Sequence, residues 1–147
     1  MLSLLSFLTV VVLLLASSAY SMDSGEEIAL RKLTVTTDVL TSYEDELVNE
    51  PVSGMLLMRD TISIDLSLNS SYNYELVVWT ESSFNFVDFW VTDPSGSVPA
   101  SEQTDHFNFS VSPNSPESRI WNLQIELLEA ANSDTAYYAF ALLRRSR

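Results

Sequence analysis

The 147-residue sequence contains no cysteine. This absence excludes a disulfide framework, a zinc site built on thiolates and a cysteine nucleophile. Many small extracellular domains depend on disulfide bridges, so a domain of this composition must be held together by side-chain packing alone. The length suits one domain with a single core, and aromatic residues make up 11% of the chain. We therefore expect one domain with an aromatic-rich core.

Glycine and histidine are also scarce. The three glycines, Gly25, Gly54 and Gly96, are not clustered, so the sequence has no loop that could cradle a nucleotide phosphate. It also lacks a Gly-x-Ser-x-Gly elbow. The only histidine, His106, follows Asp105 at the start of a predicted strand. A catalytic histidine needs a nucleophile and an orienting carboxylate, so we interpret His106 as a surface residue and expect no catalytic residue and no cofactor.

Positive charge is in short supply, with 7 Lys and Arg against 20 Asp and Glu and a formal net charge of −13. Residues 1–22 carry no charged side chain, so the negative charge belongs entirely to the remainder of the chain. Such a field opposes binding to nucleic acid and to anionic membrane surfaces. It is compatible with a basic protein partner, with weak Ca²⁺ binding, or simply with high solubility.

The first 21 residues have the pattern of a secretory signal peptide. Nearly every residue from Leu2 to Leu15 is apolar, and Ala16–Ala19 supplies the small residues that signal peptidase requires, with cleavage after Ala19 or Ser21. The rival interpretation is an uncleaved anchor, but the apolar run falls short of the ~20 residues that span a bilayer. No Lys or Arg precedes the run, which departs from the usual pattern. We expect a secreted, extracellular protein with no membrane span after cleavage.

Alternation of apolar and polar residues predicts short strands along most of the remaining chain. Turn-type residues separate the strands, the run 97–105 is predicted to be a loop, and no long helical pattern is present. This favours an all-β fold, an antiparallel β-sandwich of seven to eight strands of immunoglobulin or fibronectin type, with a closed barrel as the alternative. The predicted strands are Leu30–Leu40, Val52–Met58, Asp60–Leu68, Tyr72–Thr80, Phe84–Thr92, Phe107–Val111, Trp121–Leu127 and Tyr138–Leu142. Residues 22–29 are then an acidic flexible leader, 30–143 the domain and 144–147 a basic tail.

The stretch Tyr72–Gly96 is the most aromatic part of the chain and predicts a central hairpin. Its second strand could present Phe84, Phe86, Phe89 and Trp90 as a platform for carbohydrate. Apolar residues occur on both faces of that strand, however, which is typical of a strand buried between layers. We interpret these aromatics as core and expect ligand contact at the loops that end the hairpin.

Two acidic stretches resemble metal sites. The run Asp65–Asn69 is similar to the Asp-x-Ser-x-Ser motif of von Willebrand A domains, but its alternation is better explained by the solvent face of a strand. The run 44–46, with Asp38 or Glu50, could bind Ca²⁺ through carboxylate oxygens, although it lacks the spacing and glycine of an EF-hand. We interpret both as solvated faces and assign no metal ligand.

Two Asn-x-Ser sequons are present, at Asn69 and Asn108. Both are candidate N-glycosylation sites in a secreted protein. Asn69 lies in a predicted turn and is expected to be the more accessible acceptor, since Asn108 lies within a predicted strand.

The central stretch also resembles a known family. Four features carry the resemblance: the run Arg59–Thr61, the pair Trp79-Thr80, the sequence Phe-x-Val-Thr-Asp-Pro-Ser-Gly ending at Gly96, and the strand that begins at Trp121. Together they are similar to a β-sandwich module of the calcium-activated chloride channel regulator family. The resemblance extends over residues 48–143, with Ile120 replacing a polar residue of the family. The metalloprotease and von Willebrand A parts of that family have no counterpart here. The resemblance therefore implies a non-catalytic extracellular sandwich.

These observations favour a secreted, non-enzymatic binding or accessory module with an unidentified protein partner. One alternative is an acidic matrix or mineral-associated protein that binds Ca²⁺ weakly. A small glycosidase or esterase is a further alternative, because paired carboxylates can hydrolyse glycosidic bonds, but no pair stands out in the sequence.

Overall fold

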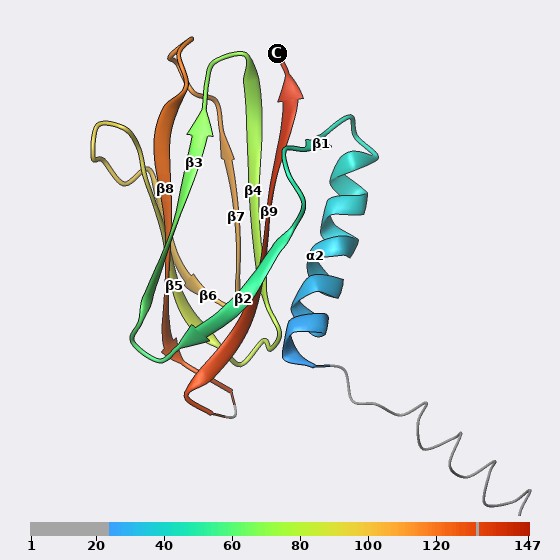
Figure 1. Cartoon of the computed structure of the whole chain (residues 1–147), viewed down its shortest axis with the longest axis vertical. Coiled ribbons are helices and arrows are strands. Elements are labelled where there is room, and N and C mark those ends of the chain that lie inside the picture. The colour runs from blue at the N-terminus through green and yellow to red at the C-terminus, as the bar shows by residue number, and fades with distance from the viewer. Residues whose placement is uncertain (1–23, 132) are drawn as a thin grey trace, which may run out of the picture.

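A computed structural model describes residues 24–131 and 133–147. Within this part of the chain there are one helix, α2 (Gly25–Thr41), and nine strands (Figure 1). The predicted signal peptide, residues 1–21, lies outside the described residues, as do residues 22 and 23 of the predicted leader. No helix in the described part is long and apolar enough to cross a membrane.

The strands form two antiparallel sheets that face each other. Sheet A has the order β1-β9-β4-β7, and β2 also pairs with β9; sheet B has the order β3-β8-β5-β6. The two sheets do not close into a barrel, so the predicted antiparallel β-sandwich is confirmed and the barrel alternative is wrong. Sheet A contains β1 (Glu46–Leu47), β2 (Val52–Leu57), β4 (Tyr72–Thr80), β7 (His106–Val111) and β9 (Thr135–Ser146), and sheet B contains β3 (Thr61–Leu68), β5 (Phe86–Thr92), β6 (Ala100–Thr104) and β8 (Arg119–Glu129).

The core lies between the sheets and is built from alternate residues of each strand. Phe89 of sheet B and Phe107 of sheet A are 0% and 2% exposed, and their rings stack with centroids 5.4 Å apart. Leu123, Ile125 and Leu127 of β8 are fully buried against the same cluster. Burial of each such side chain stabilises the fold by about 1.5–3 kcal/mol, which explains how the domain holds together without disulfides.

The first predicted strand, Leu30–Leu40, is wrong, because this segment belongs to helix α2. Alternation of β-branched residues suggested a strand, yet Val35 is 61% exposed. The buried helix residues Ala29, Leu33 and Thr37 follow a spacing of four, which defines the helical face. Ser24 begins the helix with a capping box: its hydroxyl accepts the Glu27 N–H (3.2 Å), and the Glu27 carboxylate accepts the Ser24 N–H (3.0 Å).

Two further boundaries differ from the sequence prediction. Residues 25–29, predicted as a flexible leader, are the first turns of α2, since their acidic residues complete the capping box. The predicted basic tail, 144–147, continues β9 to Ser146. Arg144 and Arg145 pair with Glu46 and Asp45 at 2.7 and 3.0 Å, so electrostatic pairing holds this segment in sheet A.

Strand β6 lies inside the run 97–105, which was predicted to be a loop. As an edge strand it carries polar residues and shows little alternation.

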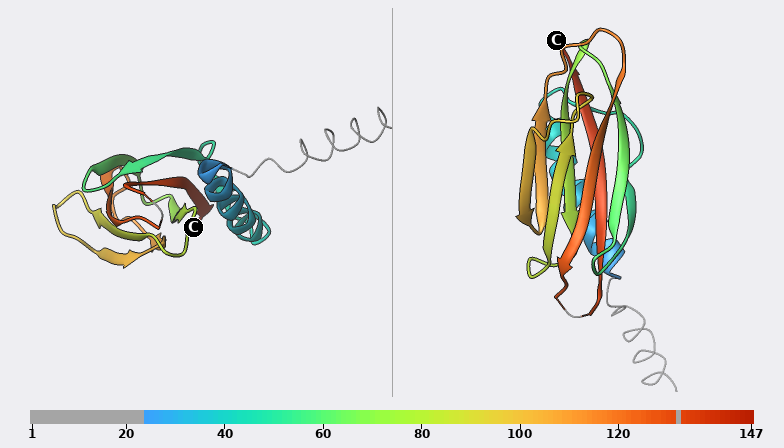
Figure 2. Two further views of the ribbon diagram at one scale, coloured as in Figure 1. Left: turned by 90° about the horizontal axis from the view of Figure 1, so that it is seen from below. Right: turned by 90° about the vertical axis from the view of Figure 1, so that its left-hand side faces the viewer.

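Helix α2 covers the outer face of sheet A only (Figure 2). Ala29 and Leu33 pack there against Val77, Ala139, Ala141 and Leu143, a second core cluster built largely from small residues. Among the described residues, nothing packs over the outer face of sheet B. The molecule therefore has one covered and one open sheet face.

Candidate functional site

The open face of sheet B carries a tryptophan among polar side chains. The strand register places Ser63, Gln124, Trp90 and Ser101 in one row that crosses all four strands. The row on one side of it contains Asp65, Asn122 and Thr92, and the row on the other side contains Thr61, Glu126, Asp88 and Gln103. These residues alternate with the buried positions of their strands, so their side chains point away from the core. We call this surface the Trp90 face.

The predicted central hairpin at Tyr72–Gly96 is wrong, because β4 belongs to sheet A and β5 to sheet B, so the two strands do not pair and the turn between them crosses from one sheet to the other. Of the four aromatics interpreted as core, Phe89 alone is buried. Phe84 and Phe86 are 82% and 42% exposed, and Trp90 is only partly buried. Strand β5 is central within its sheet, but no layer formed by residues 24–131 and 133–147 covers its outer side. The sequence did contain a signal for this arrangement, because Asp88 and Thr92 alternate with Trp90 on the same side of the strand.

A shallow hollow of about 570 Å³ lies beside the Trp90 ring. Its lining combines the indole and Val98 with polar and acidic groups from β5 and β6: Asp88, Ser101, Glu102 and Gln103. An aromatic surface beside a few directed polar groups is the usual composition of a ligand site. The hollow therefore makes the Trp90 face the leading candidate for a binding surface.

The electrostatics of the Trp90 face are unbalanced. Asp88 lies directly opposite Glu126 on the neighbouring strand, an arrangement of like charges that destabilises a sheet. The three rows of the face contain no Lys or Arg among the described residues that could offset this repulsion. On the β3 side, in contrast, the Asn122 amide donates to Ser63 Oγ (2.7 Å) and Asp65 Oδ1 (2.8 Å), which fixes those groups. The face thus offers uncompensated negative charge next to an aromatic ring.

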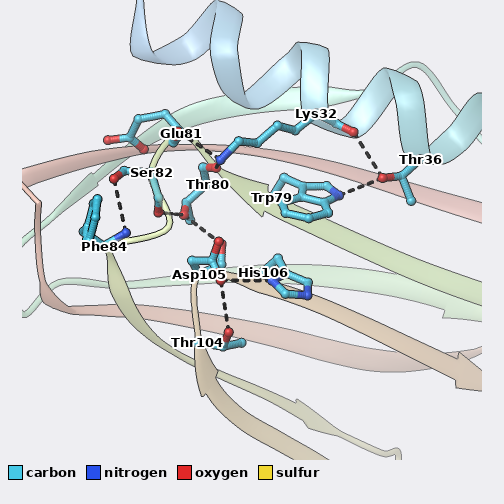
Figure 3. A network of polar contacts seen from close by, with 10 residues as sticks. All are labelled: Lys32, Thr36, Trp79, Thr80, Glu81, Ser82, Phe84, Thr104, Asp105 and His106. Atoms are coloured by element: carbon cyan, nitrogen blue, oxygen red, sulfur yellow. Dashed lines mark hydrogen bonds and ion pairs between the residues drawn. The ribbon is translucent and has the colours of Figure 1, made fainter.

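His106 lies in a different place, at the junction of α2 and sheet A (Figure 3). Its ring stacks on Trp79 with centroids 4.5 Å apart, and its Nδ1 lies 3.0 Å from Asp105 Oδ1. Trp79 in turn donates its indole N–H to Thr36 Oγ1 of the helix at 2.9 Å. Lys32 donates to the carbonyl oxygens of Thr80 and Glu81 (3.1 and 3.0 Å) and lies 5.6 Å from the Trp79 ring centroid. This network attaches the helix to the sheet.

The His106 network does not have the geometry of a catalytic triad. The Thr80 hydroxyl donates to the carbonyl oxygen of Asp105 at 2.7 Å and is therefore not directed to the imidazole. Burial acts to raise the pKa of Asp105, but the hydrogen bond and positive charge of His106 and the hydroxyl of Thr104 outweigh it and lower that pKa. His106 is thus exposed, as predicted, and its ring is held between the Asp105 carboxylate and the Trp79 indole.

The carboxylates considered for Ca²⁺ are engaged elsewhere. Asp45 receives two hydrogen bonds from the Arg145 guanidinium, at 3.1 and 3.0 Å, and Glu46 receives one from Arg144. Asp65 faces outward on β3 and accepts from Asn122. Among the described residues, no group of three or more His, Cys, Asp or Glu side chains is arranged to hold a metal ion. The acidic stretches are thus paired or solvated surface.

The two sequon asparagines differ in exposure, in the opposite order to that expected. Asn108 is exposed on β7, where it lies opposite Val77. Asn69 is partly buried: its amide nitrogen donates to Ser118 Oγ (3.3 Å), and its Oδ1 accepts the Ser71 N–H (2.9 Å). Glycosylation at Asn69 and Asn108 stays a prediction, with Asn108 the more accessible acceptor.

The Asp-Pro-Ser-Gly turn that follows β5 is fixed by its own aspartate. Asp93 Oδ1 accepts the Ser95 hydroxyl (2.6 Å) and the N–H groups of Ser95 (2.9 Å) and Ser97 (3.0 Å). The Ser95 hydroxyl contributes most to a lowered pKa of the Asp93 carboxyl; burial acts in the opposite direction but is outweighed, and the backbone N–H donors add to the lowering. Gly96 has a φ of +87°, which favours glycine. The turn borders a hollow of about 450 Å³ that Trp121 helps to line. Ligand contact at this loop stays a prediction.

Comparison with known proteins finds similarity in fold only. No family model and no curated protein sequence matches this chain. Among solved structures, it is similar to a mitogen from Yersinia pseudotuberculosis (TM-score 0.49, 11% identity, covering 67% of this chain and 85% of that one). It is also similar to the pre-peptidase C-terminal domain of a Bacillus anthracis collagenase (0.46, 17%, 64% and 88%). A third is PliG, a periplasmic inhibitor of g-type lysozyme from Aeromonas hydrophila (0.44, 15%, 65% and 85%). At these identities the likeness concerns chain topology, and no site residue is taken from it.

Proposed function

We propose that this protein is a secreted, non-catalytic interaction module that binds a basic protein partner through the Trp90 face. The observation that carries the proposal is the position of Trp90 beside the Asp88–Glu126 pair on a sheet face that no other described element covers. The signal-peptide pattern at residues 1–21 supports secretion. The resemblance to the sandwich module of the calcium-activated chloride channel regulator family supports a role without catalysis.

An arginine of the partner would fit the Trp90 face because one side chain satisfies both of its features. The guanidinium stacks on an indole ring with a gain of about 0.5–2 kcal/mol. It also donates to carboxylates in a planar, bidentate geometry. Such a contact would neutralise the Asp88–Glu126 repulsion, which costs a few tenths to about 1 kcal/mol in the free protein. The net charge of −13 would further accelerate association with a basic surface.

A titration with model ligands tests the proposal. The full chain without its signal segment is titrated with hexa-arginine and hexa-lysine peptides and with the uncharged oligosaccharides cellohexaose and chitohexaose. Calorimetry is carried out at about 0.05 M and about 0.3 M salt, a range over which exposed charges become screened. We expect hexa-arginine to bind more tightly than hexa-lysine, with an affinity that falls as salt rises.

Three variants locate the binding. Trp90→Ala is expected to lower hexa-arginine affinity about tenfold, and the double variant Asp88→Asn/Glu126→Gln is expected to reduce both affinity and salt dependence. Asp38→Asn, which removes one exposed carboxylate from α2, is the matched control and should leave affinity within about twofold. Equal loss in Asp38→Asn and the Trp90-face variants would show non-specific attraction and overturn the proposal. Salt-independent binding of an oligosaccharide that Trp90→Ala abolishes would instead assign the face to glycans.

A further inference from the structure

The two sheets of the sandwich separate along one side, where an apolar groove opens into the core. Strand β2 runs along sheet A into the turn at 58–60, and β3 runs from that turn along sheet B. The two strands therefore diverge with distance from the turn (Figure 1). The groove has a volume of about 450 Å³. Its floor is formed by inward-facing residues of β3 and β9, and the connection 48–52 lies at its rim. The apolar floor residues are Ile62, Ile64, Leu66, Phe140 and Leu142. The groove meets the Trp90 face at the β3 edge, where Ser63 and Asp65 belong to both, but Trp90, Asp88 and Glu126 do not line it.

One polar group of the groove has no partner. Tyr138, on the inner face of β9, is 7% exposed, and its hydroxyl makes no hydrogen bond to any described residue. Among the described residues, every side-chain polar atom that is fully enclosed has a hydrogen-bond partner. Because the Tyr138 hydroxyl has none, it is not fully enclosed. It must therefore meet the open space of the groove that its side chain lines. Because the hydroxyl is open to the groove and bonds no described residue, it is available to exchange hydrogen bonds with a ligand that enters there.

Gly54 makes room for the Tyr138 ring. A Cβ at position 54 would lie 2.8 Å from Tyr138 Cε1 and 2.9 Å from its hydroxyl oxygen, closer than atoms pack. Strand interiors disfavour glycine, and its presence there often marks a close approach. The pair Gly54–Tyr138 thus places the hydroxyl within the groove. Burial also raises the pKa of Tyr138, so the phenol stays neutral and can both donate and accept.

The shape and charge of the groove restrict its ligand. Tyr138, Phe140 and Leu142 follow one another on the inner face of β9, so the floor spans the five residues 138–142, a rise of about 13 Å along the strand. Asp65 lies at the rim, and no Lys or Arg is among the lining residues. In a chain of net charge −13, an anionic head group such as a carboxylate would be repelled. An elongated apolar chain with an uncharged polar end fits these conditions.

We propose that this groove binds a single-chain, uncharged amphiphile such as a medium-chain alcohol or a monoacylglycerol. The aliphatic chain lies on Ile64, Phe140 and Leu142, and the hydroxyl end exchanges hydrogen bonds with Tyr138. The volume of about 450 Å³ is within the range of small-molecule sites. Because Trp90, Asp88 and Glu126 do not line the groove and Tyr138 is not part of the Trp90 face, the two proposals stand or fall separately.

A fluorescence displacement assay tests this site. N-phenyl-1-naphthylamine, an uncharged apolar dye, is added to the full chain without its signal segment and then displaced with 1-decanol, decanoate or decylammonium. We expect 1-decanol to displace the dye at a concentration at least tenfold lower than decanoate does. Absence of dye binding to folded protein, or displacement by decanoate as readily as by 1-decanol, would overturn the proposal.

Variants separate a ligand site from a loosely packed core. Tyr138→Phe keeps the ring and should retain dye binding, but it should weaken 1-decanol about five- to tenfold, the effect of one lost hydrogen bond. Ile64→Gln should abolish displaceable dye binding, whereas Ile120→Gln should leave it unchanged, since Ile120 is 55% exposed on the outer side of the same sheet. Circular dichroism confirms that each variant is folded. An unchanged 1-decanol affinity in Tyr138→Phe would refute the role of the hydroxyl and with it the site.

Discussion

Asn85 is the clearest test of how the connection between β4 and β5 is held. It is 4% exposed and immediately precedes β5. Its amide nitrogen donates to Glu81 Oε2 (3.0 Å), and its Oδ1 accepts the N–H of Ala131 (3.0 Å) in the β8–β9 connection. The same Glu81 oxygen accepts the N–H of Tyr137 at 2.8 Å. One side chain thus joins the β4–β5 and β8–β9 connections, both of which cross between the two sheets at this end of the sandwich.

Replacing Asn85 with alanine removes two hydrogen bonds, one of them to a charged group. A neutral hydrogen bond contributes about 0.5–1.5 kcal/mol and one to a charged group about 1.5–3 kcal/mol. We therefore expect Asn85→Ala to lower the free energy of unfolding by about 2–4 kcal/mol. Urea denaturation followed by tryptophan fluorescence measures this loss, and an unchanged m-value confirms that the unfolding transition is otherwise the same. Asn108→Ala, at an exposed position of β7, is the control and should change stability by less than about 0.5 kcal/mol.

The variant Asn85→Asp gives a second, pH-dependent readout that cavity formation cannot mimic. Its new carboxyl would face Glu81 at hydrogen-bonding distance, where two ionised carboxylates repel. We expect a loss of stability at pH 7 that diminishes as the pH falls and one of the two groups binds a proton. A loss below about 0.5 kcal/mol in Asn85→Ala, or a pH-independent loss in Asn85→Asp, would refute the role of this network.

Two further predictions concern the ends of elements. Ser24→Ala removes one half of the α2 capping box and should lower the free energy of unfolding by about 1 kcal/mol, measured by thermal unfolding. The control is Ser83→Ala, at an exposed loop position, which should leave the melting temperature unchanged. The lowered pKa of Asp93 contributes stability that is present above its unfolded-state value of 3.8 and is lost as the pH falls through the lower folded-state value. The stability difference between the wild type and Asp93→Asn should therefore be largest near neutral pH and shrink below about pH 4; a constant difference from pH 2 to pH 7 would contradict the turn geometry.

The strands were predictable where one face is buried and the other solvated. In β3, Thr61–Leu68, every second residue is apolar, and this strand lies within one residue of its predicted limits. Helix α2 was not predictable in the same way, because Val35 and Val39 gave a period of two even though both are exposed on the helix surface. The capping residues Ser24 and Glu27 did carry the correct signal, and they outweigh the alternation that follows them.

The candidate site was harder to predict than the fold. Whether Trp90 faces a core or solvent depends on whether a further layer covers sheet B, and the only local signal was the polar pair Asp88 and Thr92 on the same side of the strand. The Asp88–Glu126 juxtaposition depends on the register between β5 and β8, which lie 38 residues apart along the chain. The Tyr138 groove depends on the divergence of β2 and β3, which adjoin in sequence and would be expected to form a hairpin. Tertiary arrangement, rather than local propensity, determined all three.

The position of β9 has a consequence for biosynthesis. This strand is the last in the chain, yet it is central to sheet A, where it pairs with β1, β2 and β4. Until residues 135–146 have been synthesised, those three strands have no central partner and expose unpaired edges. Sheet A is thus expected to assemble only after translation of this segment, through contacts of long sequence separation that form slowly. A ribosome-bound chain lacking β9 should be sensitive to protease and bound by chaperones, while addition of the final dozen residues should confer protection.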